Sequence, residues 1–323
     1  MRILILSCGT RCLLVKYFMD RANGFDQVIT TDCDRNAPAL YFSDKYYIVE
    51  RMTSPSYQRQ ILDICEKERI DVVLPLQEDE LILTARNRQV FLNHGIIPCI
   101  SDYETVALCR DKLAFCHFLQ EAGLEPIPTY SKEDYFRGEA PLEFPCFVKP
   151  RYGAGSVSSQ AVDSRTMLDE LMGRNDTEYI IQPFIHGQEY GVNAYCDYDT
   201  GELLELFILK KISMRAGETF KSVSVHNDAI ADMIHTLVRK MRFRGPVDID
   251  IFESDGQYRI LEVNPRFGGG YPHAYQCGIN FPRRIAENLS GRGFGRGITP
   301  YPDQIIALRY TDIYVQKGIA DEE

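Results

Sequence analysis

The chain has 323 residues and a formal net charge of −10, with 45% hydrophobic and 25% charged residues. This length allows two or three domains, each with its own hydrophobic core. The acidic balance argues against a nucleic acid as partner, because clustered Lys and Arg are needed to hold a phosphate polymer. No apolar run reaches about 18 residues, so we predict no membrane span and expect a cytoplasmic protein.

The first third of the chain alternates short apolar runs with amphipathic stretches. We predict strands at "RILILS", "QVITTD", "DVVLPL" and "IPCI", separated by helices at 11–22, 56–69 and 79–93. This pattern is typical of a doubly wound α/β domain, in which both faces of a parallel sheet are covered. The turn "CGT" lacks the G-x-G-x-x-G fingerprint, so the sequence does not indicate dinucleotide binding.

The rest of the chain changes character. Residues 101–130 predict a linker and one helix, with Ser101 or Asp102 as its cap and Gly123 as its end. From residue 144 onward strands dominate, which predicts an α+β layout with antiparallel hairpins. The expected elements are strands at "PCFVKP", "EYIIQPFI", "EYGVNAYCD", "ELLELFILKKI", "GPVDIDIFE", "YRILEVNP" and "QIIALRYTDIYV", helices at 164–173, 225–241 and 273–289, and a flexible connector at 291–297.

The cysteines and histidines show no metal-binding pattern. Ten cysteines are scattered without a C-x-x-C pair, and the six histidines have no zinc spacing. Most cysteines lie inside apolar runs such as "FPCFVKP", as small buried hydrophobic side chains do. We therefore predict neither a disulfide framework nor a zinc site.

In the hairpin "GPVDIDIFESDGQYRILEVNP" the question is which side chains of the two strands share a face of the sheet. Strict alternation puts Val247, Ile249 and Ile251 on one face with Leu261 and Val263, leaving Asp248, Asp250, Glu262 and Asn264 on the other. A two-residue turn at Asp255-Gly256 would instead move Glu262 to the wrong face, because a slip of one residue inverts every side chain. We therefore predict a three-residue loop or a bulge, with Gly256 at a positive φ.

On that facing, Asp250, Glu262 and Asn264 would cluster and present three hard oxygen ligands. Such a set selects Mg²⁺ or Mn²⁺, and a cation would relieve the repulsion between the two carboxylates. Arg266 follows at the next step and can fork onto a phosphate or a carboxylate. The alternative is a solvated hairpin face.

A second segment has the composition of a phosphate-binding loop. In "FVKPRYGAGSVSSQAV", Lys149 ends a strand and is followed by Gly153, Gly155, Ser156 and further serines. Backbone N–H groups and hydroxyls of such a loop can hold phosphate oxygens, with the lysine as a point charge. It is not a Walker A loop, since G-K-[ST] is missing. The alternative is a mobile surface loop, and Lys112 alone indicates no more than a surface lysine.

Two further stretches could serve a nucleotide. The linker Gln182-Pro183-Phe184-Ile185 offers backbone amides and apolar contact to a planar base, and Glu189 could accept both hydroxyls of a ribose. A basic run follows at Lys210, Lys211, Arg215 and Lys221. In an acidic protein such a run suits an anionic substrate or a γ-phosphate, although a solvated face is the usual meaning.

Taken together and in this order, these residues resemble the ATP-grasp superfamily, most closely its carbamoyl phosphate synthetase large-chain-like branch. The most specific part is "DIDIF…LEVNPRFGG". The resemblance implies a Rossmann-like pre-ATP-grasp domain at 1–103, then an ATP-grasp fold of two α+β subdomains, a small one at 104–185 and a large one at 186–323. A full carbamoyl phosphate synthetase large chain has two such units, whereas this chain has one.

The resemblance also implies roles for the residues above. Lys112 and Lys149 would hold the phosphates of ATP, residues 153–159 with Gly153, Gly155 and Ser156 would form a phosphate lid, Gln182, Pro183, Phe184 and Ile185 the adenine hinge, and Glu189 the ribose acceptor. Asp250, Glu262 and Asn264 would bind Mg²⁺, and Arg266 would bridge phosphate and the reacting carboxylate. Lys210, toward ATP, and Arg215, toward the substrate, are looser assignments.

The implied activity is an ADP-forming ligase. A carboxylate would be phosphorylated by ATP, and an amine or a thiol would attack the acyl phosphate. The partners would be small-molecule carboxylates and amines, with a homodimer as the default assembly. Alternatives are an ATP-binding regulatory protein with little turnover and an oxidoreductase resting on 1–103 alone. Candidate substrate walls are Ser7 to Thr10, Gln77 to Glu80, the loop 268–275 with His273, and Arg215.

Overall fold

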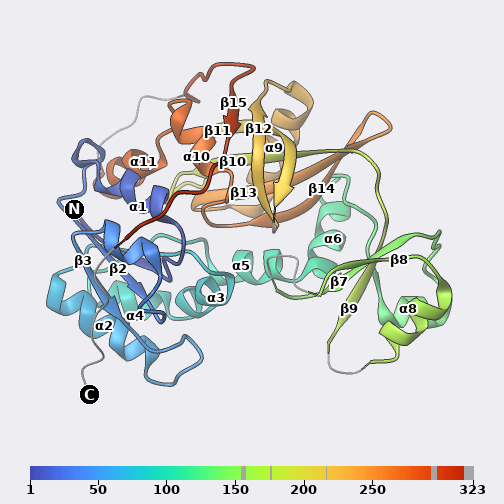
Figure 1. Cartoon of the computed structure of the whole chain (residues 1–323), viewed down its shortest axis with the longest axis horizontal. Helices are drawn as coiled ribbons and strands as arrows, with labels where there is room; N and C mark the ends of the chain where they lie inside the picture. The colour runs from blue at the N-terminus through green and yellow to red at the C-terminus, as the bar shows by residue number, and fades with distance from the viewer. Residues whose placement is uncertain (154–157, 175–176, 216, 292–296, 316–323) are drawn as a thin grey trace.

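A computed structural model describes residues 1–153, 158–174, 177–215, 217–291 and 297–315 of the chain. Within these residues the strands form three sheets, of five, four and six strands (Figure 1). The five-stranded sheet lies in the N-terminal third, the four-stranded sheet forms a lobe on the opposite side, and the six-stranded sheet lies above and between them. In these same residues, no helix is both long and apolar enough to cross a membrane.

The N-terminal sheet is parallel throughout, with the strand order β3-β2-β1-β4-β5. Its strands are β1 (Arg2–Leu6), β2 (Gln27–Asp32), β3 (Lys45–Ile48), β4 (Val72–Pro75) and β5 (Ile97–Pro98). Along β1, Ile3 and Ile5 belong to one apolar core, while Leu4 and Leu6 belong to another. The apolar run is continuous because both faces are covered, which confirms the predicted fold class.

The helices of this region depart in detail from the prediction. They are α1 (Cys12–Met19), α2 (Tyr57–Glu68), α3 (Glu78–Arg86) and α4 (Arg88–Asn93), with 3₁₀ turns at Arg21–Asn23 and Pro38–Phe42. The helix expected at 79–93 is two helices, broken at Asn87, and strand β3 was not predicted at all. Strand β3 is an edge strand whose side chains are largely exposed, so it carries no apolar run.

The expected single helix after residue 101 is also two helices, α5 (Tyr103–Arg110) and α6 (Lys112–Glu121). Asp111 lies between them, and its Oδ1 accepts hydrogen bonds from the backbone N–H of Leu113 at 3.2 Å and Ala114 at 3.1 Å. Such a cap satisfies amides that the first turn of a helix leaves unpaired. Because the cap at Asp111 starts a new helix, Lys112 occupies the first position of α6, at the edge of the lobe that follows.

The lobe is an antiparallel sheet in the order β6-β9-β7-β8, covered by α8. Its elements are β6 (Tyr130–Ser131), α7 (Lys132–Arg137), β7 (Cys146–Pro150), β8 (Gln160–Val162), α8 (Arg165–Met172) and β9 (Tyr179–Pro183). Strand β7 ends in Lys149 and Pro150 and pairs with β9 in such a register that Phe147 lies opposite Gln182. The strand that carries the lysine therefore lies beside the strand that leads into the predicted hinge.

The six-stranded sheet has the order β14-β13-β10-β11-β12-β15 and is antiparallel throughout. Its elements are β10 (Gln188–Cys196), β11 (Leu203–Arg215), β12 (Glu218–Ser224), α9 (Asp228–Met241), β13 (Gly245–Ser254), β14 (Gln257–Asn264), α10 (Tyr271–Gln276), α11 (Phe281–Leu289) and β15 (Ile306–Leu308). Helix α9 packs on one face. The last strand docks on β12 as expected, although only three of its residues are paired.

The hairpin β13–β14 resolves the question of facing. Ser254 pairs with Gln257, so the turn Asp255-Gly256 is a two-residue turn, with φ of 54° and 73° at its two residues. A bulge follows, because Asp250 pairs with Glu262 while Ile251 pairs with Ile260, leaving Leu261 as the extra residue. The predicted bulge and the positive φ of Gly256 are confirmed; the expectation that a two-residue turn would separate Asp250 from Glu262 is wrong.

The bulge also corrects one core assignment. Ile260 is 1% exposed and belongs to the core beneath the sheet, whereas Leu261, predicted for that core, is half-buried and lines the cleft on the other face. One extra residue in a strand shifts the alternation beyond it. Side chains after the bulge therefore keep the facing that the metal-site hypothesis requires.

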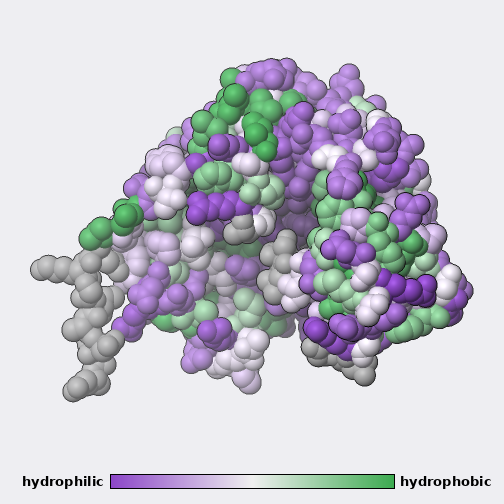
Figure 2. Space-filling model, turned by 45° about the vertical axis from the view of Figure 1, so that its right-hand side comes forward, coloured by the Kyte–Doolittle hydropathy of each residue, from purple (hydrophilic) through white to green (hydrophobic). Residues whose placement is uncertain are grey.

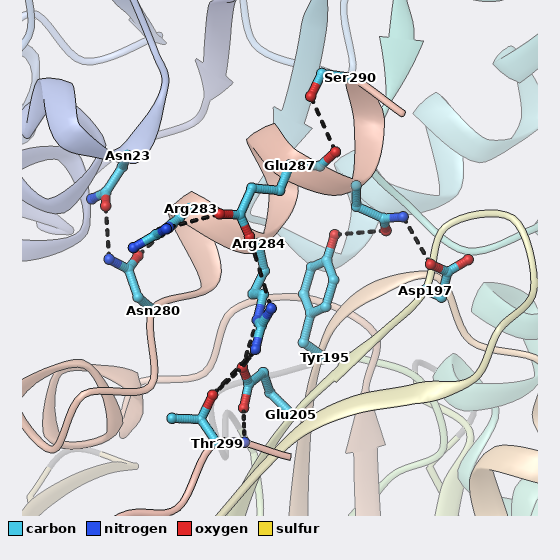
Figure 3. A network of polar contacts seen from close by, with 11 residues as sticks. Asn23, Tyr195, Asp197, Glu205, Asn280, Arg283, Arg284, Glu287, Ser290 and Thr299 are labelled. Atoms are coloured by element: carbon cyan, nitrogen blue, oxygen red, sulfur yellow. Dashed lines mark hydrogen bonds and ion pairs between the residues drawn. The ribbon is translucent and has the colours of Figure 1, made fainter. Parts of the chain in front are cut away.

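A polar network ties α11 to the large sheet (Figure 3). The Glu205 side chain on β11 is 1% exposed and accepts from Arg284 Nε at 2.5 Å, and from the N–H and hydroxyl of Thr299 at 2.9 and 2.7 Å. Asn288 accepts from the hydroxyl of Tyr195 at 3.1 Å. These contacts hold α11 and the segment after it against strands β10 and β11.

We expect Glu205→Ala to lower the free energy of unfolding by about 3 kcal/mol, because a buried ion pair that loses one partner leaves the other charge poorly compensated. Urea denaturation measures this loss. The exposed Glu202, which directly precedes β11, provides a control, and Glu202→Ala should stay within about 0.5 kcal/mol of the wild type. Equal losses in the two variants would contradict the role of the network.

Candidate active site

The three sheets enclose one large cleft, with a volume of about 870 Å³. Its hollow is visible between the small lobe and the body of the molecule in Figure 2. The N-terminal sheet contributes Arg11, Gln77 and Glu78, while the lobe and the large sheet supply most of the other walls. The cleft therefore lies where all three parts of the chain meet.

The structure brings most of the predicted site residues to this cleft. They are Lys112, Lys149, Gly153, Gln182, Pro183, Phe184, Ile185, Glu189, Asp250, Glu262, Asn264 and Arg266. Gly155 and Ser156 lie outside the described residues. Lys210 and Arg215 do not line the cleft; Arg215 is exposed and its guanidinium lies over the Phe220 ring.

One end of the cleft is suited to a planar apolar group. Gln182 is buried, and its side-chain amide donates to the hydroxyl of Thr129 at 2.8 Å, which fixes the start of the hinge. The hinge then lines the cleft beside an apolar set formed by Ile127, Phe147, Met214 and Leu261. Flat apolar walls next to a free backbone edge are what a nucleobase needs.

Two lysines lie between this end and the large sheet. The Nζ of Lys112 donates to the carbonyl oxygen of Gly153 at 2.7 Å, so the first residue of α6 contacts the start of the glycine-serine loop. Lys149 is 6% exposed, and burial lowers the pKa of its ammonium to about 8, against the attraction of Glu262. A buried cation of this kind has unsatisfied charge, which a phosphate can neutralise.

The pKa of Lys149 predicts how nucleotide affinity depends on pH. Below a pH of about 8 the ammonium is charged in the free protein and attracts phosphate; above it the lysine is neutral and must take up a proton on binding. We expect the Kd of a non-hydrolysable ATP analogue to rise about tenfold per pH unit above this value. Calorimetric titration measures it, and Lys149→Arg, which stays charged, should flatten the rise.

The polar wall of the cleft consists of rows across neighbouring strands. Asp250 on β13 lies opposite Gly191 on β10 and Glu262 on β14, and in the next row Asp248 lies opposite Asn193 and Asn264. This wall holds the predicted Asp250, Glu262 and Asn264 and adds Asp248, which the sequence reasoning placed on the correct face but gave no role.

Lys211 is the main site residue to which the sequence reasoning gave no role, although it was named in the basic run. Its side chain is 5% exposed, and its Nζ lies 2.5 Å from Glu189 Oε1 and 2.6 Å from Asp250 Oδ1. A β-carbon on Gly191 would lie 3.4 Å from Lys211 Cε, so the lysine reaches Asp250 across a strand that has no side chain there. Burial opposes the charge of Lys211, but Asp250 and Glu189 raise its pKa above the ordinary value.

The wall fits a divalent cation. No group of three or more His, Cys, Asp or Glu residues that could hold a metal occurs in the described part of the chain; the predicted set has two carboxylates, Asp250 and Glu262, and would need the amide of Asn264 as its third donor. Burial raises the pKa of Asp250 to about 8, and although Lys211 opposes this shift, Asp248 and Glu262 add to it. The raised pKa means that Asp250 tends to hold a proton in the absence of a cation; a divalent cation would replace that proton, and oxygen donors of this kind suit Mg²⁺.

The far end of the cleft carries Arg266, from the loop after β14. Its guanidinium lies 3.5 Å from Asp248 Oδ2 and 3.9 Å from Glu78 Oε1, both long for ion pairs. Gly268 follows, and a β-carbon there would lie 2.0 Å from Asp248 Oδ1, so only glycine permits this approach. Of the candidate substrate walls, Gln77, Glu78, Gly269 and Gly270 line the cleft, while His273 is buried against Ser222 instead.

Comparison with known families agrees with this geometry. Residues 3–100 match the model of the PylC-like N-terminal domain, and residues 109–270 match that of the ATP-grasp domain. The chain belongs to the ATP-grasp family. The family match spans both the lobe and the polar wall of the cleft, so the resemblance carried by the hairpin, the lysines and the hinge is confirmed.

Individual relatives of this ATP-grasp protein are distant. The arginine-specific large chain of carbamoyl phosphate synthase from Bacillus subtilis (strain 168) is 24% identical over 262 residues, covering 75% of this chain and 24% of that protein. The chain thus spans about a quarter of the length of the curated relatives it matches.

Solved structures share the fold. N5-carboxyaminoimidazole synthetase from Staphylococcus aureus complexed with ADP has a TM-score of 0.72 at 17% identity, with 91% of this chain and 78% of that chain covered. The L-amino acid ligase from Bacillus licheniformis has a TM-score of 0.70 at 19% identity, with 90% and 76% covered. At these identities the likeness establishes the fold alone.

Proposed function

We propose that this protein is an ADP-forming ligase that activates a carboxylate with ATP and joins it to an amine. The observation that carries the proposal is the set of groups that line one cleft: an apolar hinge, two lysines, an acidic wall and an arginine. The names of two structural neighbours, a synthetase and a ligase, agree with it. The proposal that a carboxylate reacts with an amine through an acyl phosphate rests on the residues of the cleft and on these names.

The proposed placement of ATP follows the cleft. The base lies at Gln182 to Ile185, and Lys112 and Lys149 contact the phosphates. A divalent cation held by Asp250, Glu262 and Asn264 would neutralise charge on the phosphate oxygens. The γ-phosphate then points toward Arg266, at the end of the cleft beyond the acidic wall.

In the proposed reaction a carboxylate oxygen of the substrate attacks the γ-phosphorus, and the bond to the bridging oxygen breaks to release ADP. Arg266 and Lys149 counter the charge that develops on the phosphoryl oxygens. An amine then attacks the carbonyl carbon of the acyl phosphate, and phosphate leaves. The protein supplies position and charge but no nucleophile, so catalysis depends on the cleft excluding water.

The experiment is an ADP-release assay with a panel of carboxylic acids and hydroxylamine as a general nucleophile. Hydroxylamine traps an acyl phosphate as a hydroxamate, so no knowledge of the natural amine is needed. We expect at least one acid to give ADP and hydroxamate in equal amounts. Binding of Mg·ATP without acid-dependent ADP formation would instead favour an ATP-binding regulatory protein.

A further inference from the structure

Two charged side chains of the N-terminal domain enter the far end of the cleft. Arg11 follows strand β1, and Glu78 begins helix α3 just after strand β4. Strands β1 and β4 are neighbours in the order β3-β2-β1-β4-β5, and the chain changes direction across the sheet between them. In open parallel sheets, ligands bind at this switch point, beyond the carboxyl ends of the strands.

Arg11 lacks an anionic partner. Its guanidinium forms no ion pair or side-chain hydrogen bond within the described part of the chain, although Nη1 lies only 3.7 Å from the position of a β-carbon on Gly269. The nearby Arg309 differs, because it is paired with Glu218 and donates to the Gly269 carbonyl oxygen at 2.8 Å. Burial, and then the charge of Arg266, lowers the pKa of Arg11, while the more distant carboxylates of Glu218 and Asp248 oppose this shift. An anion placed between Arg11 and Arg266 would relieve both.

Glu78 lacks a close cationic partner. Its one ion pair in the described residues is with Arg266, whose Nη2 lies 3.9 Å from Oε1, and no hydrogen-bond donor serves its carboxylate there. Burial raises the pKa of Glu78, while Arg266 opposes this shift. The side chain is 19% exposed, so its carboxylate is only partly removed from water, and an ammonium would provide the charged donor that it lacks.

A third group at this end is also unsatisfied. The side-chain nitrogen of Asn193 is buried without a hydrogen-bond partner in the described residues, and it lies 3.8 Å from the position of a β-carbon on Gly270. Asn193 is 2% exposed and lines the cleft in the same row as Asp248. Buried donors are nearly always satisfied, so this one indicates an acceptor supplied by a ligand.

We propose that the acid substrate is an α-amino acid, with its carboxylate between Arg11 and Arg266 and its ammonium on Glu78. This inference rests on the proposed ligase function and specifies its substrate class. Arg266 is a neighbour of both groups: its guanidinium lies 3.9 Å from Glu78, and its charge lowers the pKa of Arg11. A substrate with one negative and one positive charge on adjacent carbons matches that pair.

The ammonium takes no part in bond making. One carboxylate oxygen bonds to the γ-phosphorus as the bridging P–O bond breaks, giving an α-aminoacyl phosphate and ADP. The second substrate's amine then bonds to the carbonyl carbon, phosphate leaves, and the amine's proton passes to solvent. Glu78 holds the substrate's own amino group throughout, which keeps that group from serving as the nucleophile.

The hydroxamate assay tests this with matched acids. The panel contains the standard L-amino acids and their D-enantiomers, plus acetate, succinate and bicarbonate; each active amino acid is compared with its deaminated and N-acetylated analogues. We expect the free amino acid to exceed both analogues in kcat/KM by at least about 100-fold, because an unpaired buried carboxylate penalises them. Glu78→Gln should reduce this preference below about tenfold.

Arg11→Gln should raise the KM for the amino acid by about 50-fold, and Arg11→Lys should recover part of the loss. In each variant the Kd for a non-hydrolysable ATP analogue should change less than about twofold. A merely structural role would weaken the binding of ATP and of the amino acid together, so an effect on the amino acid alone indicates direct contact. The exposed Arg59→Gln and Glu104→Gln serve as matched controls with wild-type kinetics.

The two hypotheses fail differently. Hydroxamate from no acid at all overturns the proposed ligase function, and this inference with it. Efficient turnover of acids without an amino group, or an unchanged preference in Glu78→Gln, overturns the amino acid inference and leaves the ligase function standing.

Discussion

Glu262→Ala is expected to lower ADP formation by about 1000-fold while leaving the fold intact. Glu262 is one of the two carboxylates in the proposed metal-ligand set and lies opposite Asp250 in the bulged hairpin. Without it, the proposed ligand set keeps Asp250, which Lys211 already engages, and the neutral amide of Asn264. The side chain is half-buried at the cleft surface, so its loss creates no core cavity.

ADP release with the active acid measures the effect, and the thermal unfolding curve checks the fold. Glu253→Ala is the matched control, since Glu253 lies on the same hairpin, outside the cleft lining, and accepts from the Tyr190 hydroxyl at 3.1 Å. We expect it to keep nearly wild-type turnover. Nearly wild-type ADP release in both Glu262→Ala and Arg266→Ala would contradict the assignment of this wall.

The hairpin indicates how much of the site the sequence could predict. Alternation along β13 and β14 placed Asp250, Glu262 and Asn264 on one face only if the hairpin contained one extra residue. The sequence predicts two places for it, a three-residue loop or a bulge. The position of the insertion could not be read, because "RILEV" is apolar at both Ile260 and Leu261. Packing beneath the sheet decides which of the two is buried, and that is a property of the tertiary structure.

The basic run on β11 marks the limit of the same method. Residues 206–209 are buried on both faces of the sheet, so the strand shows no alternation that says which lysine faces the cleft. Lys210 was assigned to ATP, but it is Lys211 that meets Glu189 and Asp250. Once Glu189 and Asp250 were placed, the register of β10 against β11 would have selected Lys211, but register is not encoded in the strand itself.

The substrate end was the least predictable part. The strand ends of the N-terminal sheet were expected to open on a ligand edge, and Gln77 to Glu80 were named as candidate walls. Arg11, one residue beyond the Ser7 to Thr10 wall, was missed because a single arginine at the start of a helix has no pattern. Its meaning depends on Gly269, which is 258 positions away in the chain.

Lys211→Met should be the most destabilising change in the cleft, lowering the free energy of unfolding by about 3 to 5 kcal/mol at pH 8. The substitution keeps the length of the side chain but removes the one ammonium shared by Glu189 and Asp250, leaving two carboxylates to repel each other. The loss should be smaller at pH 5. The pKa of Asp250 is raised by burial to about 8 even with the lysine present, so the folded state binds protons more tightly than the unfolded one, and its stability falls as pH rises through that value.

Urea denaturation at pH 5 and pH 8 measures the loss of stability and its dependence on pH. Lys210→Met is the matched control, since it removes a neighbouring lysine that does not line the cleft. Mg²⁺ alone should raise the melting temperature of Lys211→Met more than that of the wild type, because a cation on the acidic wall replaces part of the lost charge. This readout needs no turnover and therefore tests the metal assignment separately from the reaction. Equal destabilisation by Lys210→Met and Lys211→Met, or a loss that does not change with pH, would mean that the ammonium is not what holds the two carboxylates together.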